Sequence, residues 1–442
     1  MKSFTEFGIK IPDILLPKNK DMSVWSVIAC DQYTQDISYW KRAADCAGSN
    51  PSTLNLILPE VYLESPDRTE RIQNIRKTMK DYLSNGVFDD AKEEFIYVER
   101  KTGYGRIRKG LVVAVDLDSY EWKPLSKALI RATEATIESR IPPRKEIRKQ
   151  APIESPHIML LVNDPQHSLV EKIGELVKKN SPVYDSNLML DAGHITGWTV
   201  SSENELNSVH DALENLKKAN TAPDGSSFLF AVGDGNHSLA TAKAVWDEYK
   251  TETGIKDSPV RYALVEIVNI YDEGLTFEPI HRVLFGIDAD ALVSYVQGKL
   301  GGILSTCASA DELEGKVKNS AASFGFVSKT EDEKGKFILL ETPVKELAVS
   351  RLQPVLDECM ASYKNENNID CTIDYIHGSD EVFRLGAQDR KDKRTVSILL
   401  PPVAKDSFFA TINSRGPLPR KSFSMGEASE KRFYLECRKL FD

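Results

Sequence analysis

The sequence has little cysteine: six residues in 442, with no C-x-x-C pair. Scattered single cysteines are typical of reduced thiols in an intracellular protein, and they offer no zinc motif. The chain also lacks a lysine-containing phosphate loop, an H-E-x-x-H motif and a G-x-S-x-G motif. The signatures of P-loop nucleotide hydrolases, zinc proteases and α/β-hydrolases are therefore missing.

Long apolar runs are also missing, and the N-terminus MKSFTEFGIKIPDILLP has acidic residues and no signal-peptide core. We therefore expect a cytoplasmic protein with no membrane partner. The net charge of -9 disfavours a nucleic-acid binder that relies on a broad basic face. A homo-oligomer is compatible with the sequence.

The length and the 41% hydrophobic content predict two or three domains. The pattern favours an α/β (mixed α+β) fold. We expect a main domain over residues 1–285 and a smaller C-terminal α/β domain over 286–442. The latter should end in a helix over 428–440, because Ser424 and Glu427 form a capping-box pattern before it.

The chain is organised around residues 227–250, SFLFAVGDGNHSLATAKAVWDEYK. Residues 227–232 have the composition of a buried strand, and apolar residues recur at helical spacing from Ser238 onward. The turn between them, GDGN, therefore lies at a helix N-terminus, where backbone N–H groups and the helix dipole favour an anion such as phosphate. Gly235 allows a close approach of the backbone to such a ligand.

Three polar side chains follow in this turn: Asp234, Asn236 and His237. They are suited to bind metal, orient a hydroxyl or move a proton. The plainer alternative is that the first two form the turn and cap the helix. An imperfect G-x-G-x-x-G, with Ser238 in the third glycine position, keeps a dinucleotide-dependent oxidoreductase open as a third reading.

Residues 100–150 are unusually basic, with thirteen Lys and Arg against six Asp and Glu. Such a stretch in an acidic protein indicates either a small, highly charged anion or a solvated face. Arginine forks and threonine hydroxyls match phosphate oxygens, and Glu134 is the natural base or Mg²⁺ ligand among them. The predicted phosphate or substrate ligands are Arg131, Thr133, Thr136, Arg140, Arg144 and Arg148.

A second tier of site residues follows predicted strands. Asp31 and Tyr33 come after the apolar run 24–29, which we predict to be a strand, and ligands of open α/β sheets bind at strand ends. His281 and Arg282 close another predicted strand, and His377 lies beside a glycine. For each of these residues an ordinary loop or salt-bridge role is the alternative.

The segment GDGNHSLATA resembles the Asp-Gly-His-His-Arg box of the ParB and sulfiredoxin superfamily, which binds nucleotides and includes free-serine kinases. Asp234, Gly235 and His237 match; Asn236 replaces a histidine and Ser238 the arginine. The motifs IRATEATIESRIPPRKEIR, YDEGLTFEPIHRVL, IDYIHG and RKSFSMGEASEKRFYLECRKL together resemble the bacterial branch of domain-of-unknown-function family 1015. The resemblance implies a ParB/sulfiredoxin-like central element and a link to serine and phosphoserine metabolism.

The leading hypothesis is a phosphoryl-transfer enzyme acting on a small amino or hydroxy acid, with serine and phosphoserine as the pair and the kinase or phosphatase direction left open. Its partner would be a small phosphorylated or carboxylate metabolite. The enzyme would use ATP or ADP and Mg²⁺, with Asp234 and Glu134 as metal ligands and Glu134, Asp234 and His237 as catalytic residues. The alternative is a nucleotide-sensing regulatory or DNA-associated module of ParB-like type.

Overall fold

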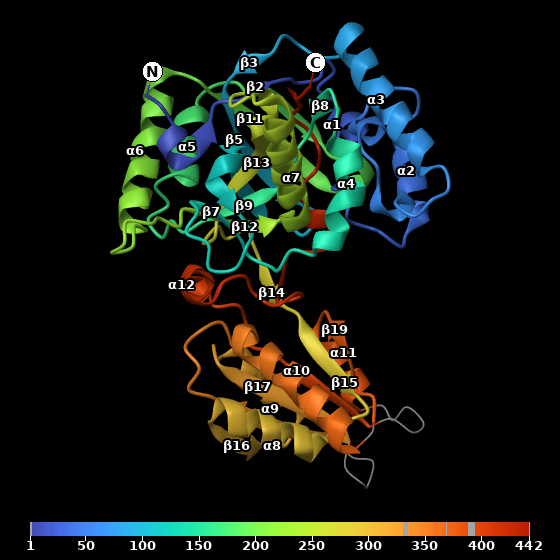
Figure 1. Ribbon diagram of the computed structural model, residues 1–442, viewed down its shortest axis with the longest axis vertical. Helices are drawn as coiled ribbons and strands as arrows, with labels where there is room; N and C mark the ends of the chain where they lie inside the picture. The colour runs from blue at the N-terminus through green and yellow to red at the C-terminus, as the bar shows by residue number, and fades with distance from the viewer. Residues whose placement is uncertain (1, 330–334, 368, 388–393, 442) are drawn as a thin grey trace. The chain divides into compact units, whose positions relative to one another are not determined.

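The computed structural model describes residues 2–329, 335–367, 369–387 and 394–441. It divides into two compact units (Figure 1). Unit 1 comprises Met1–Leu275 and Gly426–Asp442, and unit 2 comprises Thr276–Met425. The chain thus leaves unit 1 once and returns to it for its last residues. Both units combine helices with sheets, and the predicted mixed α/β class is confirmed.

Unit 1 is built on a ten-stranded mixed sheet in the order β10-β11-β4-β5-β13-β9-β12-β7-β6, with β1 paired to β5. The strands are β1 (Ile9–Lys10), β4 (Phe95–Thr102), β5 (Ile107–Asp116), β6 (Tyr120–Glu121), β7 (Ile130–Ala132), β9 (Met159–Val162), β10 (Tyr184–Asn187), β11 (Gly193–Val200), β12 (Phe230–Asp234) and β13 (Tyr262–Asn269). The order places β7 next to β12, and these two strands run parallel.

Alternation along the strands gives this sheet two apolar faces. In β4, Phe95 and Tyr97 join one core, whereas Ile96 and Val98 join the other. Successive side chains of a strand point to opposite faces, so a strand covered on both sides is apolar throughout. The helices of unit 1 are α1 (Met22–Trp25), α2 (Ile37–Ala47), α3 (Arg68–Ser84), α4 (Ile141–Arg148), α5 (Val170–Val177), α6 (Glu203–Ala219) and α7 (Asn236–Thr253).

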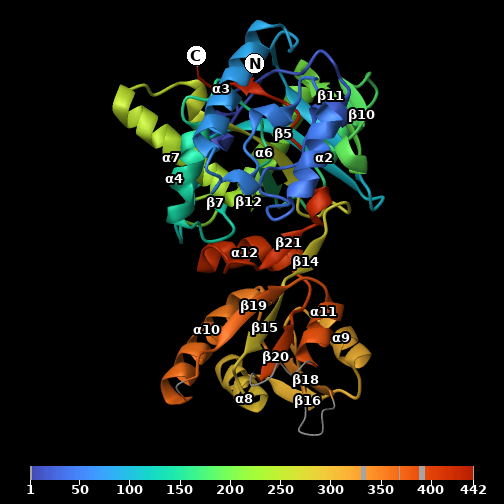
Figure 2. The ribbon, with the colours of Figure 1, turned by 90° about the vertical axis from the view of Figure 1, so that its right-hand side faces the viewer.

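These helices are divided between the two faces. Apolar residues of α5, α6 and α7 belong to the first core, and those of α1, α2 and α3 belong to the second. Figure 1 shows α5 and α6 on the opposite side of the sheet from α2 and α3. Helices α4 and α7 pack side by side in both views (Figures 1 and 2).

The C-terminal segment corrects a prediction. Residues 428–440 do not form a helix: they contain a 3-10 turn, η8 (Ala428–Glu430), and a short strand, β22 (Arg438–Lys439). The capping box joins Glu427 to Glu430 and does not involve Ser424. The segment is held by pairing to unit 1, because β22 pairs with β8 (Ile153–Glu154) and Tyr434 N–H donates to the Val27 carbonyl. Tertiary pairing thus overrides a helical pattern.

The N-terminal run 24–29 is also not a strand. Asp21 caps the short helix α1 by accepting from the Ser23 N–H, and beyond it Ile28 makes a single bridge to Phe433. Unit 1 also contains two short strands that pair antiparallel, β2 (Asp13–Ile14) and β3 (Lys92–Glu93). The central strand and helix are confirmed, although α7 begins at Asn236, two residues before the expected start.

Unit 2 contains an antiparallel six-stranded sheet in the order β16-β18-β17-β20-β15-β19. Its strands are β16 (Ile303–Thr306), β17 (Ser323–Lys329), β18 (Gly335–Glu341), β15 (His281–Phe285), β19 (Thr372–Ile376) and β20 (Thr395–Leu399), and β14 (Phe277–Pro279) pairs separately with β21 (Phe423–Met425). Its helices are α8 (Ala289–Leu300), α9 (Ala310–Lys318), α10 (Ala348–Asn367), α11 (Ser379–Gly386) and α12 (Lys405–Arg415). Helices α8 and α10 share one core with the sheet, and α9 and α11 share another (Figure 2).

All six cysteines are free thiols. Among the described residues, none of the helices combines the length and apolarity that a membrane crossing requires.

Candidate functional site

The connection from β12 to α7 is a tight turn at Gly235. This residue has φ +81°, and a Cβ there would lie 2.9 Å from Ile158 Cγ1, so both the backbone conformation and the space require glycine. The N-cap residue of the 18-residue helix α7 is Gly235, which has no side chain to cap the helix. A helix N-terminus presents backbone N–H groups and the positive end of the helix dipole, and both favour an anion.

The basic stretch meets this turn. The parallel pairing of β7 with β12 brings Thr133 next to Asn236, about a hundred residues later in the chain. Thr133 N–H donates to Asn236 Oδ1 (3.1 Å), Asn236 Nδ2 donates to Thr133 Oγ1 (3.3 Å), and Thr133 Oγ1 donates to the Val232 carbonyl (2.5 Å). Asn236 therefore ties two strand ends together, and it does not cap its own helix.

His237 fixes the next part of the same loop. Its Nε2 accepts the N–H of Ile137 at 3.3 Å. In the neutral ring, an accepting Nε2 places the proton on Nδ1. Thr136, one residue earlier, has a buried hydroxyl oxygen with no hydrogen-bond partner within the described part of the chain. Buried polar atoms are normally satisfied, so this hydroxyl has hydrogen-bonding capacity left for a ligand or a water molecule.

The carboxylate of Asp234 lies at the same turn. Its Oδ1 accepts the Gly235 N–H at 3.1 Å, and its Oδ2 lies 3.5 Å from Nζ of Lys431, which the C-terminal segment contributes. Glu134 is half-buried in the loop after β7. Two carboxylates and one ammonium group thus belong to the segments that form this turn.

The four predicted arginines have different surroundings. Arg131 is buried, lies 4.5 Å above the Phe228 ring and donates from Nε to the Ala128 carbonyl. Arg144 pairs with Glu60, and Arg148 pairs with the buried Glu154 at 2.6 Å. Arg140 is exposed. The guanidinium charges of Arg144 and Arg148 are thus matched by carboxylates of the same chain.

The loop that carries Asp31 and Tyr33 is linked to α4. Glu60, the partner of Arg144, donates its backbone N–H to the Cys30 carbonyl. Tyr33 stacks on Tyr39 with ring centroids 3.9 Å apart, and burial raises the pKa of its hydroxyl. Asp31 accepts from the Gln32 side chain at 3.0 Å. The loop thus belongs to the unit that holds the turn.

A family model confirms the predicted family. The model for proteins of unknown function DUF1015 matches residues 12–359. The chain belongs to this family. The motif quoted from residues 420–440 lies beyond the matched range, and the likeness of the central turn to the ParB and sulfiredoxin box stays a prediction.

Among curated proteins, none matches this DUF1015 chain. Solved structures that resemble it include a free serine kinase in complex with AMP (13% identity, TM-score 0.35, 73% of this chain and 90% of the other). Another is a conserved hypothetical protein from Pyrococcus furiosus, with 12% identity, a TM-score of 0.34, and coverage of 75% of this chain and 95% of the other. A third is SbnI from Staphylococcus aureus, with 10% identity, a TM-score of 0.34, and coverage of 73% of this chain and 85% of the other. Similarity at this level does not extend to function.

The remaining second-tier residues belong to unit 2. Burial lowers the pKa of His281 to about 4, assisted by the neighbouring Arg282, and its Nδ1 accepts the Leu400 N–H at 3.0 Å. Arg282 is fully buried and donates to Gln353 at 3.0 Å. His281 and Arg282 do not close a strand, as predicted, but open β15, because the predicted strand is divided into β14 and β15. His377 directly follows β19, the antiparallel neighbour of β15. These contacts hold unit 2 together, whereas the turn at Gly235 lies in unit 1.

The sequence did not point to His157, Tyr434 or Lys431. Ser238 Oγ lies 3.0 Å from His157 Nε2, and the Tyr434 hydroxyl lies 2.7 Å from His157 Nδ1. His157 precedes β9 and Tyr434 lies in the C-terminal segment, so neither is close to Ser238 along the chain. In the sequence, only the C-terminal motif hinted at Lys431 and Tyr434. It indicated that this segment is ordered, but not where the segment lies in the fold.

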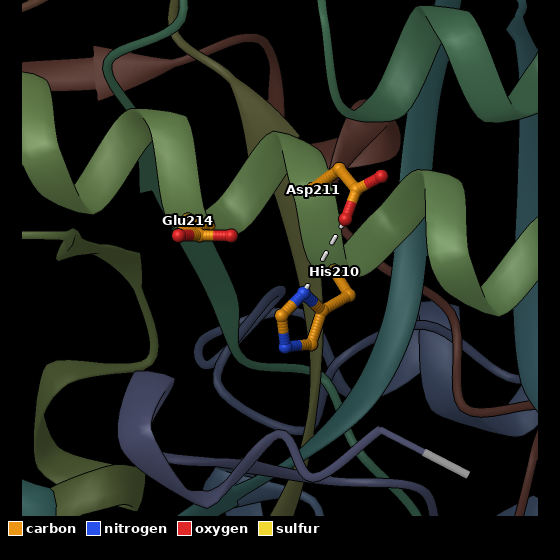
Figure 3. A group of neighbouring side chains, drawn as sticks. All are labelled: His210, Asp211 and Glu214. Atoms are coloured by element: carbon orange, nitrogen blue, oxygen red, sulfur yellow. Dashed lines mark ion pairs between the residues drawn. The ribbon is translucent and has the colours of Figure 1, made fainter.

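One group of side chains has the spacing of a metal site within the described ranges: His210, Asp211 and Glu214 on α6, with ligand atoms within 4.8 Å of one another (Figure 3). Two lysines already neutralise its carboxylates, because Lys2 pairs with Asp211 at 2.5 Å and Lys218 with Glu214 at 2.6 Å. We therefore interpret this group as an ion-pair cluster on a helix surface.

Proposed function

We propose that this protein is a phosphoryl-transfer enzyme that acts on a small amino or hydroxy acid, with serine and phosphoserine as the substrate pair and ATP or ADP as the nucleotide. The observation that carries the proposal is the junction of the basic stretch with the glycine turn through Thr133, Asn236 and His237. It joins threonine hydroxyls, carboxylates and a helix N-terminus in one place. Phosphoryl transfer depends mostly on such positioning and charge neutralisation.

The phosphate-binding part would be the N-terminus of α7 with Gly235, Asn236 and Ser238. Its backbone N–H groups supply the donors and the close approach. Thr136 adds a buried hydroxyl whose hydrogen-bonding capacity is unused among the described residues. Lys431, beside Asp234, would balance charge at the turn. Arg140 and Arg131 would supply further positive charge, and Arg144 and Arg148 are paired with Glu60 and Glu154.

The acidic residues fit a magnesium ion. Asp234 Oδ2 is buried and accepts no hydrogen bond from the described residues, and Mg²⁺ binds one or two carboxylates plus phosphate oxygens. Asp234 and Glu134 would hold the ion, which would neutralise phosphate charge when bound. Glu134 and Asp234 are the two candidate bases, and Asp234 accepts the Gly235 N–H and lies near Lys431. His237 would position the loop through Ile137.

The test is phosphorus NMR of the purified protein with Mg²⁺, run with ATP or ADP plus serine and separately with phosphoserine alone. Formation of phosphoserine, or release of free phosphate, would establish the activity and its direction. Nucleotide binding with no change in any phosphorus signal would favour a nucleotide-sensing module instead. An absorbance change with NAD or NADP and a hydroxy acid would favour an oxidoreductase.

Matched variants would then assign the residues. Glu134→Gln and Asp234→Asn should each lower turnover by at least a hundredfold, in the range that general acid-base groups supply. Glu138→Gln is the control, because Glu138 is exposed in the same segment. Wild-type turnover in Glu134→Gln and Asp234→Asn would exclude these roles.

A further inference from the structure

Two buried side chains, His157 and Tyr434, and the half-buried Ser238 form a chain of hydrogen bonds that ends at the candidate site. Ser238 Oγ lies 3.0 Å from His157 Nε2, and His157 Nδ1 lies 2.7 Å from the Tyr434 hydroxyl. The Cys30 N–H donates to the same hydroxyl at 3.3 Å. His157 is 7% exposed and Tyr434 is 3% exposed, so water does not compete strongly for these bonds. The three residues come from α7, the segment before β9 and the C-terminal segment.

The Cys30 N–H gives this chain a direction. It occupies a lone pair of the Tyr434 oxygen, so the tyrosine proton is available for the strongest acceptor in contact with it, His157 Nδ1. Burial raises the pKa of Tyr434 well above its ordinary value, so the hydroxyl keeps this proton. In the neutral ring, an accepting Nδ1 leaves the proton on Nε2, which then donates to Ser238 Oγ.

Ser238 also differs from the other hydroxyl residues of α7. Thr241, Thr251 and Thr253 each donate to the carbonyl four residues earlier, at 2.6–2.7 Å. Within the described residues, the hydroxyl of Ser238 contacts His157 and makes no such bond to its own helix. A hydroxyl that accepts from His157 has its own proton left to donate.

We propose that Tyr434 and His157 are positioning residues that make Ser238 a hydrogen-bond donor to a phosphate oxygen of the ligand. The proposal rests on the proposed function for the ligand's chemistry, but the direction of the chain does not. In this arrangement Ser238 binds and orients; it is not a nucleophile, because the His157 nitrogen that faces it carries a proton.

The first experiment measures the chain without any ligand. Long-range ¹H–¹⁵N NMR of the ¹⁵N-histidine-labelled protein at neutral pH should show the His157 proton on Nε2. Tyr434→Phe should raise the population with the proton on Nδ1, because the donor to Nδ1 is gone. A wild-type proton on Nδ1, or a tautomer that does not respond to Tyr434→Phe, would overturn the proposal.

The second experiment measures binding by titration calorimetry with ADP plus Mg²⁺ and with phosphoserine. Ser238→Ala should weaken binding of at least one probe about tenfold or more, the factor expected for a hydrogen bond to a charged acceptor. Thr251→Ala, on the same helix, should bind as wild type, because its hydroxyl is bonded to Asp247. His157→Gln should retain more affinity than His157→Ala, since an amide N–H can replace the Nε2 donor.

The outcomes separate two failures. Wild-type affinity for both probes in Ser238→Ala would overturn this inference and leave the proposed function standing. Binding without turnover by the wild type would overturn the proposed function alone. If the wild type bound neither probe, the phosphate-donor role would fail with the proposed function, even with the expected tautomer.

Discussion

Glu266 offers the sharpest test of how the C-terminal segment is held. It lies in β13, is 2% exposed, and pairs with Arg432 Nε at 2.8 Å and with Arg108 Nε at 3.3 Å. A Cβ on Gly110 would lie 2.4 Å from Glu266 Oε1, so the glycine provides the space that this carboxylate occupies. The substitution Glu266→Gln keeps the shape and removes the charge, which leaves two buried guanidinium groups short of one partner.

Breaking a buried ion pair from one side destabilises a protein by about 3–5 kcal/mol, because the remaining charge stays buried. We expect the lower end, about 3 kcal/mol, because Arg432 keeps Glu436 at 2.7 Å. Burial raises the pKa of Glu266, but Arg108 and Arg432 outweigh burial and hold the pKa below its usual 4.5. The carboxylate therefore stabilises the fold above about pH 4.5, and the difference between wild type and variant should shrink as the pH falls below that value.

Tryptophan fluorescence during urea unfolding is the right assay, because all five tryptophans lie in unit 1. Trypsin cleavage after Lys431 should also become faster in Glu266→Gln. Glu175→Gln is the matched control, since Glu175 forms an exposed pair with Lys172 on α5 and should unfold as wild type. An unfolding midpoint and a cleavage rate equal to wild type in Glu266→Gln would refute the reasoning.

Other variants test the site and unit 2. Asn236→Ala should destabilise unit 1 by about 2 kcal/mol, because it removes two hydrogen bonds to Thr133 and leaves the buried Thr133 N–H unpaired. Urea unfolding measures this loss, and a change below about 0.5 kcal/mol would contradict the prediction. Gly235→Ala should lower the free energy of unfolding by about 1–3 kcal/mol more than Gly254→Ala does. Both glycines have positive φ, but only at Gly235 would the added methyl group meet Ile158. Equal effects of the two substitutions in urea unfolding would mean that this contact does not matter. Burial and Arg282 lower the pKa of His281 from 6.5 to about 4, so its titration should weaken folding by about 3 kcal/mol as the pH falls from 6.5 to 4. An NMR titration of His281 with a midpoint near 6.5, or an equal pH effect in His281→Gln, would count against this.

Local patterns were sufficient wherever the relevant contacts are close in sequence. The change from an apolar run to helical spacing located β12 and α7, because strand burial and helix amphipathicity are written into neighbouring residues. The glycine turn was predicted for the same reason. Patterns failed at residues 24–29 and 428–440, whose structure is set by distant partners: Ile28 bridges Phe433, and β22 pairs with β8.

Some features of the candidate site could likewise be predicted from nearby residues, whereas others depend on distant ones. The sequence by itself determined the mixed α/β class, the turn at Gly235 and the chemical types gathered around it, since these follow from residue identity and short spacing. Only the tertiary structure decided that Thr133 meets Asn236, that Arg144 and Arg148 are paired with carboxylates, and that His157, Lys431 and Tyr434 approach the turn. These pairings depend on strand order and on the return of the C-terminal segment to unit 1. Neither has a local signal, because each depends on the free energy of burying surfaces that lie far apart in the chain.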